Sequence, residues 1–369
     1  NYIIVCERED IMTTLGIVAE FNPTTEGHKY ITKKAREQFP HATIVAIMSG
    51  DYTVRGEFAI FDKWTRAKSA VGAGVDLVLE LPAIYSLNGA TVFSKESVRI
   101  LSDTGIIDQI FFGAEHADKN FLAGAAKFIS EKRMSLEKFD DKISYNIFLR
   151  EEIREKFGIY PESNDLLAIE YIENLPKEIG FFPIERVVSD YNSTDLTGFS
   201  ASPIRKKIKS DGGVLFNAND KIFSSILIAA INGDFENLDE SDIARIKTAA
   251  FTSKNFDEFI ENAYHKRLSR SRIKRETLKA VIGMKNIDYI NHKDTKFIRP
   301  LASSEKGIEK LLEIKNKDAL ILKYADIKKV PEKSRELFYL NEKFTEIYHA
   351  FYDRKRYTDR TRNIFTNEA

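Results

Sequence analysis

Short, almost wholly apolar segments alternate with amphipathic segments along the first part of the chain. The apolar runs have the length of strands, and the segments between them have helical periodicity. The expected strands are 15–19, 43–48, 77–81 and 109–112, and the expected helices are 27–38, 60–73 and 92–102. Such alternation forms parallel sheets with helices on both faces, which is why their strands are apolar on both sides. The pattern therefore predicts an α/β fold.

The later segments indicate a second, helical part of the chain. Residues 118–175 have mainly helical patterns and are interpreted as an insertion, and a fifth strand is predicted over 184–188. Beyond residue 213 the strand patterns largely stop, and helices are predicted within 220–285 and 304–350. The expected organisation is an extension over 1–11, a Rossmann-like parallel-sheet domain over 12–212 and a mainly helical C-terminal domain over 213–369.

Composition narrows the class of protein. The 369 residues include 56 Lys and Arg and 56 Asp and Glu, so any nucleic-acid contact must rest on a local basic patch. The single cysteine, Cys6, excludes an intramolecular disulfide, and the six histidines show no ligand spacing, so no metal site is predicted. No apolar run approaches the roughly 18 residues of a membrane span. These features predict a cytoplasmic protein without a membrane partner.

The first predicted strand leads into a turn whose residues are typical of phosphate binding. Thr25-Glu26-Gly27-His28 stands between the strand at 15–19 and the helix at 27–38. Gly27 lets the backbone approach a ligand closely. His28 lies in the first helical turn, where free N–H groups and the helix dipole favour phosphate. A histidine there can stabilise charge as pyrophosphate leaves, so the segment predicts a nucleotide site with a catalytic histidine.

A second segment of this kind, Phe199-Ser200-Ala201-Ser202-Pro203-Ile204-Arg205, lies near the last predicted strand. Ser202 is suited to be the N-cap of a helix that has Pro203 at its first position. Hydroxyl groups and Arg205 at such a helix start can hold the β- and γ-phosphates of a nucleotide. Two such segments, each after a strand, favour nucleotide binding over an ordinary capped surface helix.

Both segments resemble the signatures of the nucleotidyltransferase superfamily, [T/H]-x-G-H and I-S-S-T-x-x-R, whose members attack the α-phosphate of a nucleotide. Further segments make the chain similar to the bacterial tRNA(Met) cytidine acetate ligase family over about residues 12–315. They are Met48-Ser49-Gly50-Asp51-Tyr52-Thr53-Val54-Arg55-Gly56-Glu57, Asp62-Lys63-Trp64-Thr65-Arg66, Gly74-Val75-Asp76-Leu77-Val78-Leu79-Glu80-Leu81-Pro82, Phe111-Phe112-Gly113-Ala114-Glu115 and Asn164-Asp165-Leu166-Leu167-Ala168-Ile169-Glu170-Tyr171. No single segment is specific to the family, but their combination is.

The resemblance implies an activity and a set of site residues. Members of the family bind ATP and acetate, form acetyl-adenylate with loss of pyrophosphate, and acetylate the wobble cytidine of elongator methionine tRNA to N4-acetylcytidine. The expected catalytic residues are His28 and Thr25, and Mg²⁺ is expected as the ATP counter-ion, held largely by phosphates and water. The expected ATP-binding residues are Val18, Ala19, Glu20, Phe21, Asn22, Pro23, Thr24, Thr25, Glu26, Gly27, His28, Lys29, Tyr30, Ile31, Gly113, Asn164, Arg186, Ser202 and Arg205.

A basic segment of the helical domain is the expected tRNA contact. From His265 to Arg275 the chain has six Lys or Arg and no acid, which suits a phosphate backbone, and the family also has a basic segment here. The expected tRNA-binding residues are Lys266, Arg267, Arg270, Arg272, Lys274 and Arg275. The alternative is a solvated helix face. The same alternative applies to Arg55, Lys63 and Arg66, which otherwise are expected to hold triphosphate or the acceptor nucleotide.

Two other functions remain open on the sequence. One is a nucleotidyltransferase that adenylylates a small metabolite, against which the basic helical domain argues. The other is an RNA-binding protein whose nucleotide site has decayed. Its support is that the family pattern Asn-Pro-Phe-His-Asn-Gly-His is replaced by Asn22-Pro23-Thr24-Thr25-Glu26-Gly27-His28. The wider superfamily accepts Thr25 at its position, and Glu26 is expected to point to solvent because phosphates would repel it.

Overall fold

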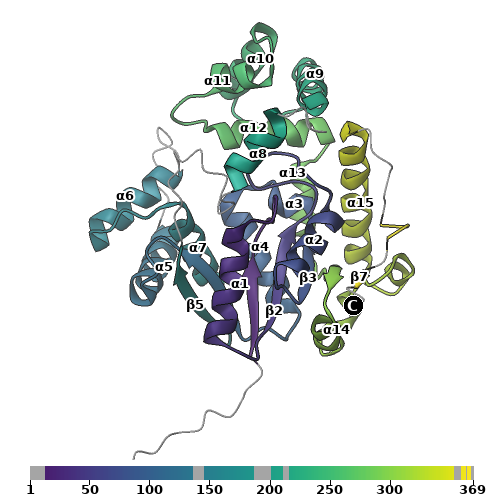
Figure 1. Ribbon diagram of the computed structural model, residues 1–369. Helices are drawn as coiled ribbons and strands as arrows, with labels where there is room; N and C mark the ends of the chain where they lie inside the picture. The colour runs from purple at the N-terminus through teal and green to yellow at the C-terminus, as the bar shows by residue number, and fades with distance from the viewer. Residues whose placement is uncertain are drawn as a thin grey trace, which may run out of the picture.

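A seven-stranded sheet forms the centre of the molecule (Figure 1). The computed structural model describes residues 13–135, 145–186, 201–210, 216–352, 359–362 and 364–366. The strands are β1 (Thr14–Val18), β2 (Thr43–Ser49), β3 (Leu77–Leu81), β4 (Gln109–Ala114), β5 (Gly180–Glu185), β6 (Pro300–Ser303) and β7 (Phe365–Thr366). Their order across the sheet is β5-β4-β1-β2-β3-β6-β7. The α/β fold predicted from the apolar runs is confirmed.

The first five strands are parallel and divide at β1. From β1 the chain proceeds to β2 and β3 on one side, and then returns to place β4 and β5 on the other. The neighbouring strands β1 and β4 therefore continue into helices that leave in opposite directions. Ligands of open parallel sheets bind in the crevice at such a switch point, beyond the carboxyl ends of the strands.

The helices cover both faces and both ends of the sheet. They are α1 (Glu26–Gln38), α2 (Lys63–Gly72), α3 (Ala83–Ser86), α4 (Gly89–Asp103), α5 (Lys119–Ser135), α6 (Tyr145–Phe157), α7 (Ser163–Glu173), α8 (Ala201–Ser210), α9 (Phe216–Asn232), α10 (Glu240–Thr252), α11 (Phe256–Ala263), α12 (Arg270–Ile282), α13 (Asn286–His292), α14 (Glu305–Leu312) and α15 (Glu332–Tyr352), with 3-10 turns at Lys317–Ala319 and Tyr324–Lys328. Local signals set several of their ends. Asp62 caps α2 by accepting from the Thr65 N–H at 2.9 Å, and Gly283 ends α12 with a φ of 69°.

The central strands are mostly apolar because two cores lie against the sheet. In β2, Val45 and Ile47 pack into one core, whereas Ile44, Ala46 and Met48 pack into the other. Successive side chains of a strand point to opposite faces, so both faces of β2 are buried. This double burial is the reason that the strand pattern shows no polar alternation.

The fifth strand differs in its position from the prediction. It covers 180–185 and not 184–188, and residues 187 and 188 lie outside the described part of the chain. The observed strand contains Pro183, and proline lacks the N–H that a central strand needs. The strand lies at the edge of the sheet, where proline is tolerated, and it pairs in parallel with β4 from Gly180 to Glu185.

The range 213–369, predicted to be a separate helical domain, also contributes strands to the sheet. β6 pairs antiparallel with β3, and β7 pairs in parallel with β6. Helices α8 to α12 lie beyond the upper edge of the sheet, where the parallel strands end, and α15 lies beside the β7 edge (Figure 1). The helical segment therefore lies over the edge at which a ligand is expected, and a domain division at 212–213 stays a prediction.

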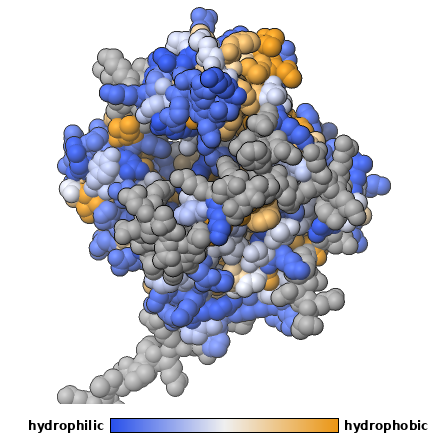
Figure 2. Space-filling view, turned by 45° about the horizontal axis from the view of Figure 1, so that its top comes forward, coloured by the Kyte–Doolittle hydropathy of each residue, from blue (hydrophilic) through white to orange (hydrophobic). Residues whose placement is uncertain are grey.

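The surface of the helical segment is mixed in character. Figure 2 shows apolar side chains gathered at the upper end of the molecule, where α9 and α10 lie. The exposed large apolar residues of these two helices are Ile228, Ile231 and Phe251.

No helix in the described part of the chain has the length and apolar character that crossing a membrane requires.

Candidate active site

The turn from β1 to α1 lies at the switch point of the sheet. Phe21 has a φ of 45°, which turns the chain sharply after the strand, and its side chain is buried. Asn22 is held by a hydrogen bond from the Ile60 N–H to its Oδ1, at 2.8 Å. Thr25 is the N-cap of α1. These anchors hold the start of α1, with its free N–H groups, at the carboxyl end of β1.

The capping of α1 fixes which ring nitrogen of His28 carries the proton. The Thr25 backbone N–H donates to His28 Nδ1 at 3.0 Å, and the Thr25 hydroxyl lies 2.9 Å from the same nitrogen. Because Nδ1 accepts a hydrogen bond, the proton of the neutral ring is on Nε2. The ring lies against Phe21, with 4.7 Å between centroids. Nε2–H has no hydrogen-bond partner among the described residues, so His28 presents a donor at the expected phosphate position.

Burial, together with the positive charge of Arg186, lowers the pKa of His28 to about 4. A neutral imidazole therefore predominates at physiological pH. Such a ring can donate from Nε2 without the solvation cost of a buried cation. Arg186 supplies the positive charge at this site, and His28 supplies an oriented hydrogen bond.

A histidine titration followed by NMR should give His28 a midpoint near 4, well below its ordinary value near 6.5. The unfolded chain binds this proton more tightly, so His28 should reduce stability as the pH falls from about 6.5 to 4 and have no effect above that window. Arg186→Gln should raise the midpoint by removing a positive charge. His28→Gln identifies the signal. A midpoint near 6.5 in the wild-type chain would contradict the capped, half-buried placement.

The sequence-predicted residues Gly113, Asn164 and Arg186 come together at the next strand ends. Gly113 lies in β4, Asn164 in the first turn of α7, and Arg186 directly after β5. Arg186 Nη1 donates to Asn164 Oδ1 at 3.1 Å, and a Cβ on Gly113 would lie 2.8 Å from Arg186 Cγ. Glycine is thus required at 113 for Arg186 to lie across the strand end.

Glu115 organises this cluster, although the sequence pattern assigned it no role. Its carboxylate accepts from the backbone N–H groups of Asn164 at 3.0 Å and Asp165 at 3.1 Å, and from the Asn164 side chain. It also lies 3.7 Å from Arg186 Nε. Two free N–H groups at the start of α7 are satisfied in this way. The signal available in the sequence was an acid two residues after Gly113, close to the end of the predicted strand 109–112.

The second signature segment reaches the same turn through Arg205. Its Nη1 donates to the backbone carbonyl of Asn22 at 2.9 Å, and its Nη2 donates to Ser202 Oγ at 3.0 Å. Helix α8 begins at Ala201, so Ser202 lies within the first turn and the predicted N-cap position is wrong. Its hydroxyl is bound to the guanidinium three residues later. Phe199 and Ser200 lie outside the described residues.

Glu26 has the solvent-facing orientation expected from the sequence. It is exposed and pairs with Lys29 at 2.7 Å, one turn further along α1. The departure Thr24-Thr25-Glu26 therefore leaves the turn intact, with Thr25 supplying the cap and Glu26 exposed beside Lys29.

Two basic residues predicted as possible ligands are structural instead. Lys63 is fully buried, with Nζ 2.8 Å from both Glu80 and Asp359. Arg66 is also buried and donates to the backbone carbonyls of Glu20, Ser49 and Gly50. Neither side chain is available to a triphosphate or to RNA. The alternative of a solvated helix face is also wrong for Lys63 and Arg66, because both side chains are buried and the acids that bind Lys63 come from distant parts of the chain.

The basic segment at 266–275 is less free than its composition indicated. Acids are absent near these cations in the sequence, but the fold brings acids from other elements beside them. Arg270 pairs with Glu261, Arg267 with Asp239 and Asp242, and Lys274 with Glu57. Arg275 donates to the Val54 carbonyl, and its backbone lies against Gly56. The start of α12 thus packs on the loop after β2. Lys266 and Arg270 remain exposed.

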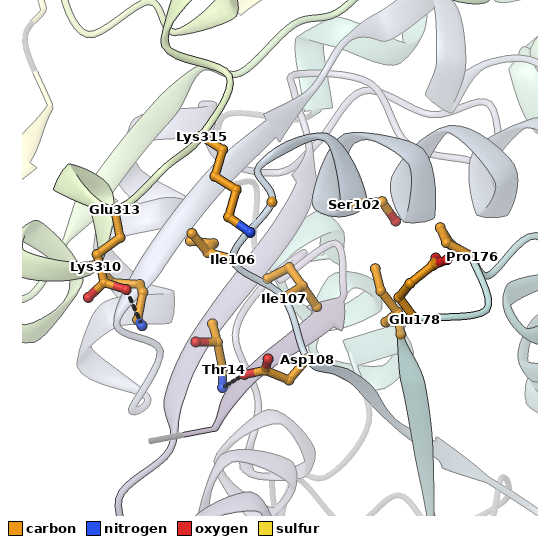
Figure 3. Close-up of a pocket in the computed structure, with 12 residues that line it drawn as sticks. Thr14, Ser102, Ile106, Ile107, Asp108, Pro176, Glu178, Lys310, Glu313 and Lys315 are labelled. Atoms are coloured by element: carbon orange, nitrogen blue, oxygen red, sulfur yellow. Dashed lines mark hydrogen bonds and ion pairs between the residues drawn. The ribbon is translucent and has the colours of Figure 1, made fainter. Parts of the chain in front are cut away.

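A hollow of about 540 Å³ lies at the opposite edge of the sheet (Figure 3). Thr14 begins β1 and Asp108 precedes β4, and the two are joined by a 2.7 Å hydrogen bond to the Asp108 carboxylate. Lys310 and Glu313 pair with each other at its rim. The hollow is therefore remote from the strand ends that carry His28 and Gly113.

The fold and the turn define a class of protein, the nucleotidyltransferases with a T/H-x-G-H motif at the first strand end. The model of the HIGH Nucleotidyl Transferase family matches residues 12–230 and 227–363. The tRNA(Met) cytidine acetate ligase of Clostridium novyi is 32% identical, over 84% of this chain and 89% of that protein. That of Ligilactobacillus salivarius is 31% identical, over 89% of this chain and 93% of that protein.

Solved structures agree with these relatives. Thermotoga maritima TmcAL in its apo form has a TM-score of 0.84 and 25% identity, covering 96% of this chain and all of that one. The same protein bound with alpha-thio ATP has a TM-score of 0.81 at the same identity. The chain belongs to the tRNA(Met) cytidine acetate ligase family.

Proposed function

We propose that this chain uses ATP to convert acetate to acetyl-adenylate and transfers the acetyl group to the exocyclic amine of the wobble cytidine of elongator methionine tRNA. The observation that carries the proposal is His28, a neutral ring held by the cap of α1 with its Nε2–H open at the switch point. The names of the relatives supply the substrates, and the alpha-thio ATP of the structural neighbour supports the nucleotide.

The first half-reaction would occur beside the β1–α1 turn. Acetate oxygen attacks the α-phosphorus of ATP, a P–O bond forms, and the bond to pyrophosphate breaks. His28 Nε2–H and Arg186 stabilise the negative charge that develops on the phosphates. Asn164 and the backbone next to Gly113 contact the base or ribose, and Arg205 lies on the side of the outer phosphates. Positioning and charge stabilisation then account for most of the rate, because no side chain is covalently modified.

Mg²⁺ would accompany ATP as a phosphate-bound ion. Among the described residues no group of three or more His, Cys, Asp or Glu side chains is placed to hold a metal. The donors would therefore be phosphate oxygens and water, which suits an ion that keeps much of its hydration.

Acetate-dependent exchange of labelled pyrophosphate into ATP, measured without tRNA, tests this half-reaction. We expect exchange that requires acetate. Exchange driven by another small metabolite and not by acetate would favour an adenylylating enzyme of small-molecule metabolism. Absence of nucleotide binding, measured by calorimetry, would favour an RNA-binding protein with a decayed site.

Lys266 and Arg270 are the exposed members of the predicted tRNA-binding segment, and the double replacement by alanine should weaken tRNA binding. The slope of log affinity against log salt should fall by about one for every phosphate that the variant no longer neutralises. Binding should be titrated at several salt concentrations. Lys328→Ala with Lys329→Ala removes the same charge at the end of a 3-10 turn elsewhere and should leave the slope unchanged. An unchanged slope in the Lys266/Arg270 variant would show that this face is only solvated.

A further inference from the structure

Glu20 follows β1 at the switch point, and the described residues engage only one of its carboxylate oxygens. Its Oε1 accepts from the Val54 N–H at 2.8 Å and from the Ser49 hydroxyl at 3.4 Å. Its Oε2 has no hydrogen-bond partner among the described residues. This oxygen is also not enclosed by those residues. The side chain is half-buried, so a rigidly held carboxylate presents one open oxygen at the strand end.

Titratable groups from four surrounding elements lie near this carboxylate. Arg66 of α2, Arg55 of the loop after β2 and Arg205 of α8 each attract it, and the fourth group is the buried Tyr171 of α7. Burial nevertheless raises the pKa of Glu20, with the Val54 N–H and the arginines opposing part of that effect. The result is a carboxylate that is more basic than an ordinary glutamate.

The transfer of an acetyl group to cytidine requires a group of this type. The exocyclic amine of cytosine is a weak nucleophile and must lose a proton as its nitrogen attacks. A carboxylate is also the usual protein partner of that amine, because it accepts a hydrogen bond from N4. A general base is more effective when its pKa approaches the working pH, and burial is the common means of raising it.

We infer that Glu20 receives the N4 amine of the acceptor cytidine and takes its proton during acetyl transfer, an inference that rests on the proposed function. The cytosine nitrogen attacks the carbonyl carbon of acetyl-adenylate. The C–N bond forms, the C–O bond to the phosphate breaks, and AMP leaves as its anion. The amine proton passes to Glu20 Oε2 and from there to water. Glu20 would thereby select a base that carries an amine at this position.

Glu20→Gln tests the inference, since the amide retains an oxygen for the Val54 N–H and the Ser49 hydroxyl. Acetate-dependent pyrophosphate exchange reports adenylate formation, and single-turnover transfer from preformed acetyl-adenylate to tRNA reports the second step. Glu20→Gln should slow transfer on the order of 10²-fold more than it slows exchange, the lower end of general-base contributions. The wild-type transfer rate should also fall on acidification through a pKa above that of an ordinary glutamate, and the variant should lose this limb.

The controls separate this inference from the proposed function. Glu185→Gln makes the same change at an exposed residue of the same sheet edge and should alter neither step. If Glu20→Gln slows both steps equally, or keeps the acidic limb, Glu20 is not the base, although the ligase assignment stands. If the wild-type chain shows no acetate-dependent exchange, the proposed function itself fails. Circular dichroism of Glu20→Gln should match that of the wild type. Glu20→Asp keeps a carboxylate on a shorter side chain, so it should recover part of the acidic limb that Glu20→Gln loses.

Discussion

His28→Ala should lower acetate-dependent pyrophosphate exchange by about 10²–10³-fold, the usual loss when one preorganised donor to a developing anion is removed. The reason is specific to the structure: Thr25 engages Nδ1, so the proton is fixed on Nε2 and points into the site. Burial and Arg186 keep the ring neutral, so the donor is present throughout the physiological pH range. Alanine removes the donor and leaves the backbone of α1 in place.

The measurement should include tRNA binding, which His28→Ala should leave close to the wild-type level, because the hydrogen bond and ring contact of His28 are with Thr25 and Phe21 of its own turn. His41→Ala is a matched control: it removes an exposed histidine just before β2, at the opposite edge of the sheet. Wild-type exchange in the His28→Ala variant would exclude His28 as a catalytic residue.

Lys63→Met should lower the free energy of unfolding by about 3–5 kcal/mol, the usual cost of removing one partner of a buried ion pair. Lys63 Nζ lies 2.8 Å from both Glu80 and Asp359, and all three side chains are almost fully buried. Burial alone would lower the pKa of Lys63, but these two carboxylates raise it, so the lysine stays charged. Methionine would leave Glu80 without a cation, whereas Asp359 would keep Arg299 at 3.0 Å.

Urea unfolding followed by fluorescence would measure this decrease. Lys34→Met removes a lysine with a nearly identical separation from its acid, 2.7 Å to Glu37, but on the exposed side of α1. Surface pairs add little to stability, so this variant should unfold at nearly the wild-type urea concentration. A Lys63→Met midpoint equal to that of Lys34→Met would show that the buried ion pairs of Lys63 with Glu80 and Asp359 do not stabilise the fold.

The parallel sheet was predictable because its signals are local. Each of the first four strands is a short apolar run. Because both faces of these strands are buried, apolar and polar residues do not alternate along them, and the runs stand out in the sequence. The turn between β1 and α1 was predictable for the same reason, since Gly27 and His28 stand at a fixed distance from the end of β1. The edge strand β5 was displaced in the prediction, which began at Ile184, whereas the strand begins at Gly180 and includes Pro183.

The features that escaped prediction depend on residues far apart in the sequence. β6 pairs with β3 across more than two hundred residues, and Asp359 reaches Lys63 from the other end of the chain. The acids that pair with Arg270 and Lys274 likewise come from other elements. Composition within a window of ten residues cannot report such partners. For the same reason Glu115 received no role, and Glu20 only a place among the expected ATP-binding residues, until the strand ends were seen together.

Acetyl transfer to tRNA is tested most directly by incubating the chain with ATP, labelled acetate and total tRNA. We predict ATP-dependent label in tRNA, recovered after nuclease digestion as N4-acetylcytidine from the wobble position of elongator methionine tRNA. His28→Ala should remove the label, and Glu20→Gln should reduce it while acetyl-adenylate still forms. Acetate-dependent pyrophosphate exchange without any label in tRNA, under conditions in which the tRNA binds, would contradict the proposed function.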